Sequence, residues 1–266
     1  MGRRRREEDR EGSEAFRARY RALYGPRWAD LEAALAAEAD SRPFCAAAGG
    51  EPYFLDSASL TAAAFLPLEG GEALDACAAP GGKTLVLASR LGPAGSLLAN
   101  ELSSDRRRRL SAVLDRHLTP ELRARVRVSG EDASSMCLRN AGRFSSILLD
   151  APCSSERHVL ADPGVLAEWT ANRPRSLARR QWALLASAWL MLAPGGWLLY
   201  STCALGPEEN EEVVARLVEK RGSLVSVDAP EGPGWEARSL GAMILPDRGG
   251  GAGPLYAARI RKAPAL

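Results

Sequence analysis

The chain has 266 residues, of which 46% are hydrophobic and 26% charged, as is usual for a globular protein with a substantial core. Its start is basic but has no apolar segment typical of a secretory signal, and the longest apolar run, 182–193, is too short to span a bilayer. The net charge of +2 does not by itself indicate binding to nucleic acid. We therefore expect a soluble, cytoplasmic protein that does not associate with membranes.

Cysteine and histidine usage limits the metal and redox chemistry. The five cysteines include no Cys-x-x-Cys pair, and the two histidines form no cluster with metal-ligand spacing. We therefore expect no metal site and no disulfide framework. Cys45, Cys77 and Cys137 are most simply read as small core residues.

Arginines cluster at residues 3–6, 106–109, 123–127 and 173–180. Such clusters can contact a phosphate backbone. However, only three of the 35 basic residues are lysines, so a general bias toward arginine explains the clusters equally well. Both interpretations stay open.

The first 48 residues are charged, with apolar side chains at helical spacing, and a loop around Gly49, Gly50 and Pro52 ends this segment. From Tyr53 onward, strand patterns alternate with helical ones. We therefore divide the chain into a helical N-terminal arm, residues 1–50, and a larger domain, residues 51–266.

The larger domain has the pattern of a sheet covered by helices on both faces. Strands are predicted at 72–77, 95–101, 125–129, 145–150 and 196–203, and helices at 84–91, 104–118, 176–192 and 210–221. Segments 224–228 and 253–262 are predicted as further edge strands. This order indicates an α/β, Rossmann-like fold with a mostly parallel, doubly wound sheet, which binds ligands at the carboxyl ends of its strands.

The segment LDACAAPGGKT, residues 74–84, joins the first predicted strand to a helix through a glycine turn. A Walker A loop needs a glycine where this chain has Cys77, and no G-x-G-x-x-G motif is present. The remaining candidate ligand is S-adenosyl-L-methionine. Small residues let the backbone approach it, and a helix N-terminus suits its carboxylate.

Acidic residues follow the next two predicted strands. Glu101 lies 19 residues after Gly82 and suits the ribose hydroxyls, and Asp132 follows the third strand, where it can meet the adenine amino group. Either acid alone is more often a strand-end cap. Together with the glycine turn, they indicate a nucleoside cofactor held at three successive strand ends.

Two thiols end neighbouring strands. Asp150 and Cys153 end the fourth predicted strand and Cys203 the fifth, so they are expected to share a pocket, because adjacent strands lie about 5 Å apart. A thiolate added to carbon 6 of a pyrimidine makes carbon 5 nucleophilic enough to accept a methyl group. The site must activate the thiol, with Lys83 placed to help and Asp150 placed to hydrogen-bond the base. These residues alone do not rank the two thiols.

The segments DACAAPGGKT, DAPCSS and YSTCALGPEENE, in this order, resemble the Nop/Sun RNA cytosine-5 methyltransferases, and the similarity covers residues 53–262. The resemblance implies a class I S-adenosylmethionine-dependent fold, with Cys203 as the nucleophile and Cys153 assisting product release. It also implies contacts to the cofactor or the base from Cys77, Ala78, Ala79, Pro80, Gly81, Gly82, Lys83, Glu101, Asp132 and Asp150.

Finer features are similar to one branch of the family. PCSSERHVL and GPLYAARIRK resemble the members that methylate small-subunit ribosomal RNA in mitochondria, which favours ribosomal RNA over tRNA. We expect no appended RNA-binding domain, and the family's Pro-His-x motif lacks its histidine near residues 245–247. Recognition would then rest on the basic arm, the arginine-rich helices, or a partner protein or pre-ribosomal particle, with the enzyme itself monomeric.

Three other functions stay open. The same chemistry could act on tRNA, or the protein could be an RNA-binding ribosome-assembly factor whose methylation is incidental. A methyltransferase acting on a protein or a small molecule would leave the two thiols unexplained.

Overall fold

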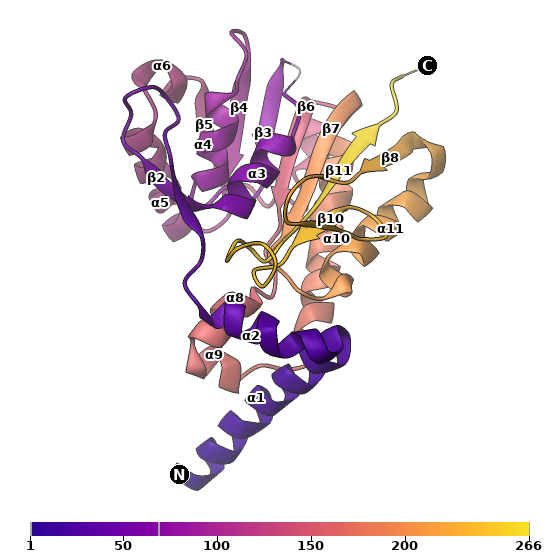
Figure 1. Ribbon diagram of the computed structural model, residues 1–266. Coiled ribbons are helices and arrows are strands. Elements are labelled where there is room, and N and C mark those ends of the chain that lie inside the picture. The colour runs from indigo at the N-terminus through magenta and orange to yellow at the C-terminus, as the bar shows by residue number, and fades with distance from the viewer. Residues whose placement is uncertain (1, 69, 266) are drawn as a thin grey trace.

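The computed structural model describes residues 2–68 and 70–265, and the side chains from residue 11 onward (Figure 1). The basic side chains of Arg3 to Arg6 lie outside the described part. The N-terminal segment forms two helices, α1 (Gly2–Tyr24) and α2 (Trp28–Ala36), separated by the short 3-10 helix η1 (Gly25–Arg27). An antiparallel hairpin of β1 (Ser41–Phe44) and β2 (Tyr53–Asp56) follows. This hairpin spans residue 50, where we divided the chain.

One sheet of nine strands organises the rest of the molecule. Its parallel part has the order β5-β4-β3-β6-β7, and β11, β10 and β9 continue it with antiparallel pairing, while β8 pairs with β11. The strands are β3 (Glu72–Asp75), β4 (Ser96–Asn100), β5 (Val126–Ser129), β6 (Phe144–Asp150), β7 (Leu192–Thr202), β8 (Val225–Asp228), β9 (Trp235–Ala237), β10 (Ala242–Ile244) and β11 (Leu255–Lys262). The predicted mostly parallel α/β sheet is confirmed.

The prediction that segment 253–262 forms an edge strand is wrong. This segment contains β11, which pairs with β7 on one side and with β10 and β8 on the other. Residues 255–258 of β11 are buried, as an interior strand requires. The three-residue strands β9 and β10, which cover that side, are too short to give a recognisable pattern.

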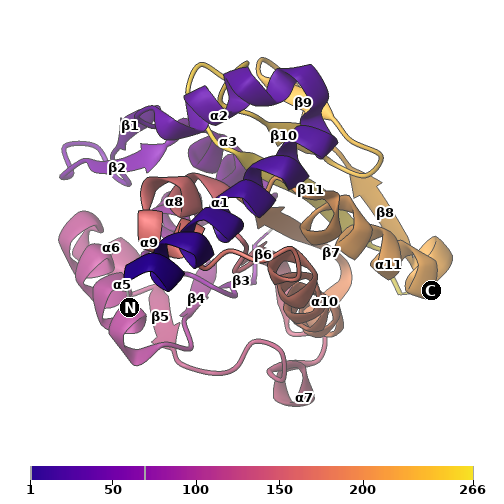
Figure 2. The same cartoon turned by 90° about the horizontal axis from the view of Figure 1, so that it is seen from below.

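Helices cover both faces of the sheet (Figures 1 and 2). The helices at 82–89, 104–117, 173–191 and 211–221 lie within a few residues of the predicted bounds, and Gly222, with a φ of 53°, ends the last of them. All the helices after α2 are α3 (Ser57–Phe65), α4 (Gly82–Ser89), α5 (Ser104–His117), α6 (Pro120–Arg123), α7 (Cys137–Asn140), α8 (Glu156–Ala161), α9 (Pro163–Ala167), α10 (Arg173–Met191), η2 (Pro207–Glu209), α11 (Glu211–Arg221) and η3 (Gly222–Leu224).

The core lies in two layers because successive strand residues point to opposite faces. Ile147 and Leu198 pack in the layer that contains the buried side of α10, whereas Leu148 and Leu199 pack in the layer under α3, α4 and α5. Aromatic residues of the N-terminal segment join the first layer; Phe16 packs edge-on against Trp169, with ring centroids 5.5 Å apart. Burial of such side chains is the main stabilising contribution.

Two further predictions from the sequence concern residues at the surface. Cys45 is exposed, so its reading as a core residue is wrong: it lies just after β1, in the loop of the hairpin. Some of the clustered arginines form ion pairs within the chain: Arg106 with Glu101, Arg108 with Asp105, Arg123 with Asp115 and Arg127 with Glu72. These guanidinium groups already have carboxylate partners.

Among the described helices, none combines the length and the apolar character needed to cross a bilayer.

Candidate active site

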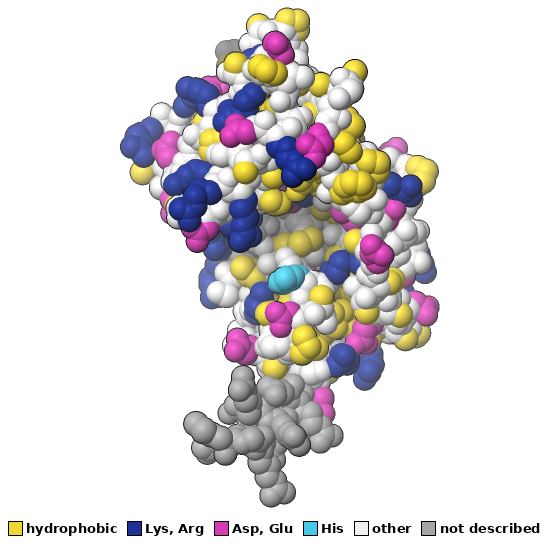
Figure 3. All heavy atoms as spheres, turned by 90° about the vertical axis from the view of Figure 1, so that its left-hand side faces the viewer, with side chains coloured by type: hydrophobic (Ala, Val, Ile, Leu, Met, Phe, Trp, Pro, Cys, Tyr) yellow, Lys and Arg dark blue, Asp and Glu magenta, His cyan; other side chains and the backbone are white. Residues whose placement is uncertain are grey.

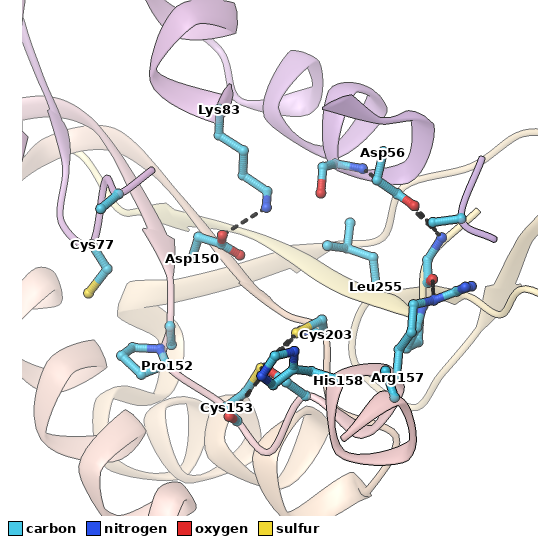
Figure 4. A pocket seen from close by; sticks show the side chains of 18 of the residues that line it. Asp56, Cys77, Lys83, Asp150, Pro152, Cys153, Arg157, His158, Cys203 and Leu255 are labelled. Carbon is cyan, nitrogen blue, oxygen red and sulfur yellow. Dashed lines mark hydrogen bonds and ion pairs between the residues drawn. The ribbon is translucent and has the colours of Figure 1, made fainter. Parts of the chain in front are cut away.

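The carboxyl ends of β6 and β7 bring the predicted catalytic residues together (Figure 4). Asp150 pairs in register with Ser201, whose hydroxyl donates to Asp150 Oδ1 at 2.9 Å. Lys83, in the first turn of α4, donates from Nζ to Asp150 Oδ2 at 2.7 Å. Burial lowers the pKa of Lys83, but the neighbouring Asp150 carboxylate outweighs it and the pKa is raised, so this ammonium stays charged.

The two predicted thiols are in contact. Cys153 Sγ lies 3.0 Å from Cys203 Sγ, and the backbone amide of Cys203 donates to Cys153 Sγ at 3.3 Å. The hydroxyl of Ser155 lies 3.1 Å from Cys203 Sγ and 3.5 Å from Cys153 Sγ. The distance between residues 153 and 203 along the chain is thus closed by the parallel pairing of β6 and β7.

The hydrogen bond between the thiols separates their acidities. It lowers the pKa of Cys203, which Ser155 lowers further, and raises that of Cys153 well above its usual value. The amide donor to Cys153 alone would favour charge there, but Cys203 is bonded by both a thiol and the nearer hydroxyl. These contacts favour negative charge on Cys203 over Cys153.

A buried carboxyl that sequence reasoning missed holds the thiol segments. Glu156 has no exposed surface; it accepts hydrogen bonds from the hydroxyls of Tyr20 and Ser154, and its Oε2 accepts from the Leu205 amide at 3.0 Å. Leu205 lies two residues after Cys203. One side chain thus fixes both segments, at a position that the sequence marks only as a charged residue.

A second missed carboxyl supports the same loop. Glu209 Oε2 accepts from the Ser154 amide and from Gln181 Nε2, both at 2.9 Å, and Gln181 also donates to the Pro152 carbonyl oxygen. Burial raises the pKa of Glu209 to about 7. The residues 152–156 are therefore held at several points from beneath.

The cofactor loop lies beside this site. A cavity of about 580 Å³ is lined by Cys77, Ala79, Lys83, Asp150, Cys153 and Cys203, among others, and a smaller one of about 60 Å³ shares several of these residues. The smaller cavity is lined by Tyr53, Leu55, Asp75, Cys77, Ala78, Ala79, Pro80, Gly82, Lys83 and Asp150. Gly81, with a φ of 121°, precedes α4 and lets the turn form.

Asp75 supports a cofactor with a charged amine. Its Oδ2 accepts from the Thr84 hydroxyl at 2.8 Å, whereas Oδ1 is buried without a hydrogen-bond partner. Burial raises the pKa of Asp75 to about 7. An ammonium group in the adjoining cavity would satisfy this oxygen, and the amides at the start of α4 suit a carboxylate, so the residues fit the methionine part of S-adenosyl-L-methionine.

Two acids from the sequence analysis lie at their strand ends but line neither cavity. Glu101 is buried; its Oε1 accepts from the Ser103 amide, and its Oε2 lies 3.5 Å from Arg106 Nη1. Asp132 accepts from the amide and hydroxyl of Ser134 and so caps the next turn. Their roles toward the cofactor stay predictions.

The larger cavity opens toward three further side chains, of which only Arg106 belongs to an arginine cluster named in the sequence analysis. His158 and Arg106 line it, as does Arg157, whose guanidinium donates to the carbonyl oxygens of Ala37, Gly251 and Gly253. Figure 3 shows a hollow on one face of the molecule, with basic side chains and a histidine at its border. This border offers positive charge to an incoming anion.

Comparison with known proteins identifies the family. The model of the family described as "16S rRNA methyltransferase RsmB/F" matches residues 62–261. A mouse protein named tRNA (cytosine(34)-C(5))-methyltransferase, mitochondrial, is 34% identical over 79% of this chain and 63% of its own length. Ribosomal RNA small subunit methyltransferase F of Aeromonas salmonicida is 40% identical over 60% of this chain and 33% of its own. The chain thus spans less than two thirds of either relative.

Solved structures agree. NSun6 from Pyrococcus horikoshii, solved with SFG, has a TM-score of 0.70 at 28% identity and covers 81% of this chain and 54% of its own. A methyltransferase homolog from the same organism has a TM-score of 0.72 at 22% identity, over 92% and 93% of the two chains, and shows the shared fold. The Nop/Sun resemblance, the class I methyltransferase fold and S-adenosyl-L-methionine as cofactor are confirmed. The chain belongs to the RsmB/F family of methyltransferases.

Proposed function

We propose that this protein methylates carbon 5 of cytosine in RNA, with ribosomal RNA as the substrate, through a covalent adduct on Cys203. The observation that carries the proposal is the contact between the Cys153 and Cys203 sulfur atoms, 3.0 Å apart and lining the same cavity as Lys83 and Asp150. A methyltransferase that acts on an amine or hydroxyl group needs no such thiol pair. A pyrimidine carbon does need a thiolate, because carbon 5 is a poor nucleophile.

Binding of the cofactor is assigned to the turn that starts α4. Asp75 takes the ammonium group and the α4 amides take the carboxylate, over the small residues 78–82. When bound, S-adenosyl-L-methionine supplies an electrophilic methyl group for carbon 5 of the base. Glu101 and Asp132 are proposed to contact its ribose and adenine.

Cys203 begins the reaction. Its thiolate, stabilised by the Cys153 thiol, attacks carbon 6 of cytosine to form an Sγ–C6 bond, and the electrons of the C5=C6 double bond shift so that carbon 5 becomes nucleophilic. Asp150 is proposed to hydrogen-bond the Watson–Crick edge of the base, where charge changes. Lys83 and Ser201 hold that carboxyl in place by bonds of 2.7 and 2.9 Å.

Cys153 assists the release of the product. Once carbon 5 carries the methyl group, its proton passes to solvent water in the cavity, the electrons of that C–H bond reform the C5=C6 double bond, and the electrons of the Sγ–C6 bond leave with the Cys203 sulfur. The leaving group is the Cys203 thiolate, to which the Cys153 thiol again donates a hydrogen bond. This contact, at 3.0 Å, stabilises the negative charge that the departing sulfur takes on.

Ribosomal RNA is favoured by the family description and by the Aeromonas relative's name. The target cytosine must leave its stack to admit the nucleophile, at a cost of about a few kcal/mol. We therefore expect it in a loop, or in RNA that is exposed before ribosome assembly is complete. The proposal places the enzyme with that RNA in the cytoplasm, which fractionation of cells can check.

A trapping experiment tests the mechanism. Cys153→Ala, expressed in growing cells, should give a slowly migrating, nuclease-sensitive band on a denaturing gel, because the adduct forms and is not released. Cys203→Ala should give none and should not methylate RNA. A band from Cys203→Ala alone would reverse the two roles, and no band from either variant would remove the reason for choosing cytosine.

The name of the mouse relative favours tRNA as a second candidate substrate. Sequencing of the RNA trapped on Cys153→Ala decides between the two. Removal of the gene should lower 5-methylcytidine in the same RNA, as measured by mass spectrometry of nucleosides. If instead Cys203→Ala preserves ribosome profiles that the deletion disturbs, the protein acts chiefly in assembly.

A further inference from the structure

Ser155 has an unusual backbone conformation between the two thiol segments. Its φ of 55° and ψ of 61° lie in the left-handed region, and it is the single non-glycine residue with positive φ in residues 2–68 and 70–265. Glycine adopts this conformation freely, whereas any residue with a Cβ does so at a cost in free energy. A serine kept in a strained backbone conformation next to two thiols points to a function for its hydroxyl.

The hydroxyl of Ser155 reaches both sulfur atoms. Its Oγ lies 3.1 Å from Cys203 Sγ, 3.5 Å from Cys153 Sγ and 3.4 Å from the Cys153 carbonyl oxygen. Ser155 also lines the cavity that holds both thiols. A hydroxyl has one hydrogen to donate and can rotate between these acceptors.

The surroundings of Cys203 make a further donor necessary. Burial and the carboxylates of Asp150 and Glu156 oppose charge on its sulfur, whereas the Cys153 thiol and the Ser155 hydroxyl favour it. A thiol is a weak donor, so the hydroxyl adds stabilisation that the Cys153 thiol alone does not give. The other charged or titratable side chains that line the cavity are Asp56, Cys77, Lys83, Arg106, Arg157 and His158.

We propose that Ser155 is a catalytic residue whose hydroxyl donates to the Cys203 thiolate before attack and to Cys153 while Cys203 is bonded to the base. No bond to Ser155 forms or breaks; only the acceptor of its hydrogen changes. The inference rests on the proposed function, in which Cys203 is the nucleophile. It adds a third group to the reacting pair.

Two variants separate the hydroxyl from the backbone strain. Both Ser155→Ala and Ser155→Gly remove the hydroxyl. The alanine variant keeps the Cβ and therefore the backbone strain, whereas glycine adopts the same φ without strain, so only the glycine variant should gain thermal stability. The rate of alkylation of Cys203 by iodoacetamide is measured against pH by peptide mass spectrometry. The exposed Cys45 in the same sample is the internal reference.

Both variants should move the midpoint of Cys203 alkylation upward by about one pH unit, equal to a tenfold loss of thiolate at a given lower pH. The kcat for RNA methylation should fall about tenfold with KM for RNA unchanged, because a hydrogen bond to the nucleophile does not bind the RNA. An unchanged midpoint in both variants overturns the proposal, as does a shifted midpoint with unchanged kcat.

The Cys203→Ala variant distinguishes failure of this inference from failure of the proposed function. If that variant still methylates RNA, Cys203 is not the nucleophile, and the catalytic role of Ser155 falls with it even where the alkylation midpoint moves. If Cys203→Ala is inactive and the Ser155 variants behave as wild type in alkylation and kcat, only the role of Ser155 is overturned.

Discussion

The hydroxyl of Tyr20 on α1 donates a hydrogen bond to the buried carboxyl of Glu156, which directly follows the segment that carries Cys153 and Ser155. The same carboxyl accepts from the Leu205 amide, two residues after Cys203. The N-terminal helix therefore supports the thiol pair from a distance along the chain of more than 130 residues. Burial raises the pKa of the Glu156 carboxyl, whereas the hydrogen bonds that these groups donate to it stabilise its ionised form.

Tyr20→Phe should destabilise the fold by about 1–3 kcal/mol, because it leaves a buried carboxyl short of one donor. It should also slow methylation by about tenfold through displacement of the thiol segments. Thermal unfolding and single-turnover methylation measure the two effects. Tyr256→Phe is the matched control: its hydroxyl donates to the Leu240 carbonyl oxygen, so stability should fall while the methylation rate is kept.

Asp75→Asn should weaken binding of S-adenosyl-L-methionine by about tenfold, because it removes the carboxylate that we propose pairs with the ammonium group of the cofactor. Stability should not fall, since burial of this carboxyl raises its pKa to about 7 and opposes its charge. Isothermal titration calorimetry and thermal unfolding measure the two quantities. Thr84→Val, which removes only the donor to Asp75 Oδ2, is the control and should bind the cofactor more tightly than Asp75→Asn does.

The stability of the protein should depend on the protonation of Glu209. Burial raises its pKa from 4.5 to about 7, so the folded state keeps a proton that the unfolded chain has lost in this range. The contribution of this protonated carboxyl to the free energy of unfolding is complete below pH 4.5. As the pH rises from 4.5 to 7, the free energy of unfolding therefore falls by roughly 2–3 kcal/mol. Glu209→Gln cannot ionise, so its stability relative to wild type should increase between these pH values in urea unfolding. A constant difference would contradict this assignment.

The effects of substituting Lys83 and Asp150 on the free energy of unfolding should be strongly coupled, because the two side chains form an ion pair. Asp150→Asn should lower the methylation rate by about 100-fold, because it removes the carboxylate that we propose hydrogen-bonds the base. For stability, Asp150→Asn should cost about 3 kcal/mol, because it leaves the Lys83 ammonium buried and unpaired. Lys83→Met should cost less, because Asp150 is partly exposed and keeps the hydrogen bond from Ser201, and the double variant should cost less than the sum of the two. Denaturant unfolding of the cycle measures this.

The exposed pair of Arg108 and Asp105 provides the control cycle. Both side chains are largely in water, so their coupling should be below about 1 kcal/mol. Additive stability effects in the Lys83–Asp150 cycle would mean that the pair is not formed in solution.

The sequence determined the arrangement of the site along the chain. Alternating strands and helices predict a parallel sheet, and parallel strands put Asp150, Cys153 and Cys203 at one edge, next to the glycine turn before Lys83. The motifs that carry these residues also identified the family. Such inferences succeed because they depend on local patterns and on one rule of topology.

Only the tertiary structure decided which groups touch. The 3.0 Å contact of the sulfur atoms, the Ser155 hydroxyl beside them and the buried Glu156 all depend on segments about 50 or more residues apart. The interior place of β11 likewise depends on which strands cover it. Contacts of this kind are set by packing and burial across the whole fold, and a local sequence pattern carries no record of them.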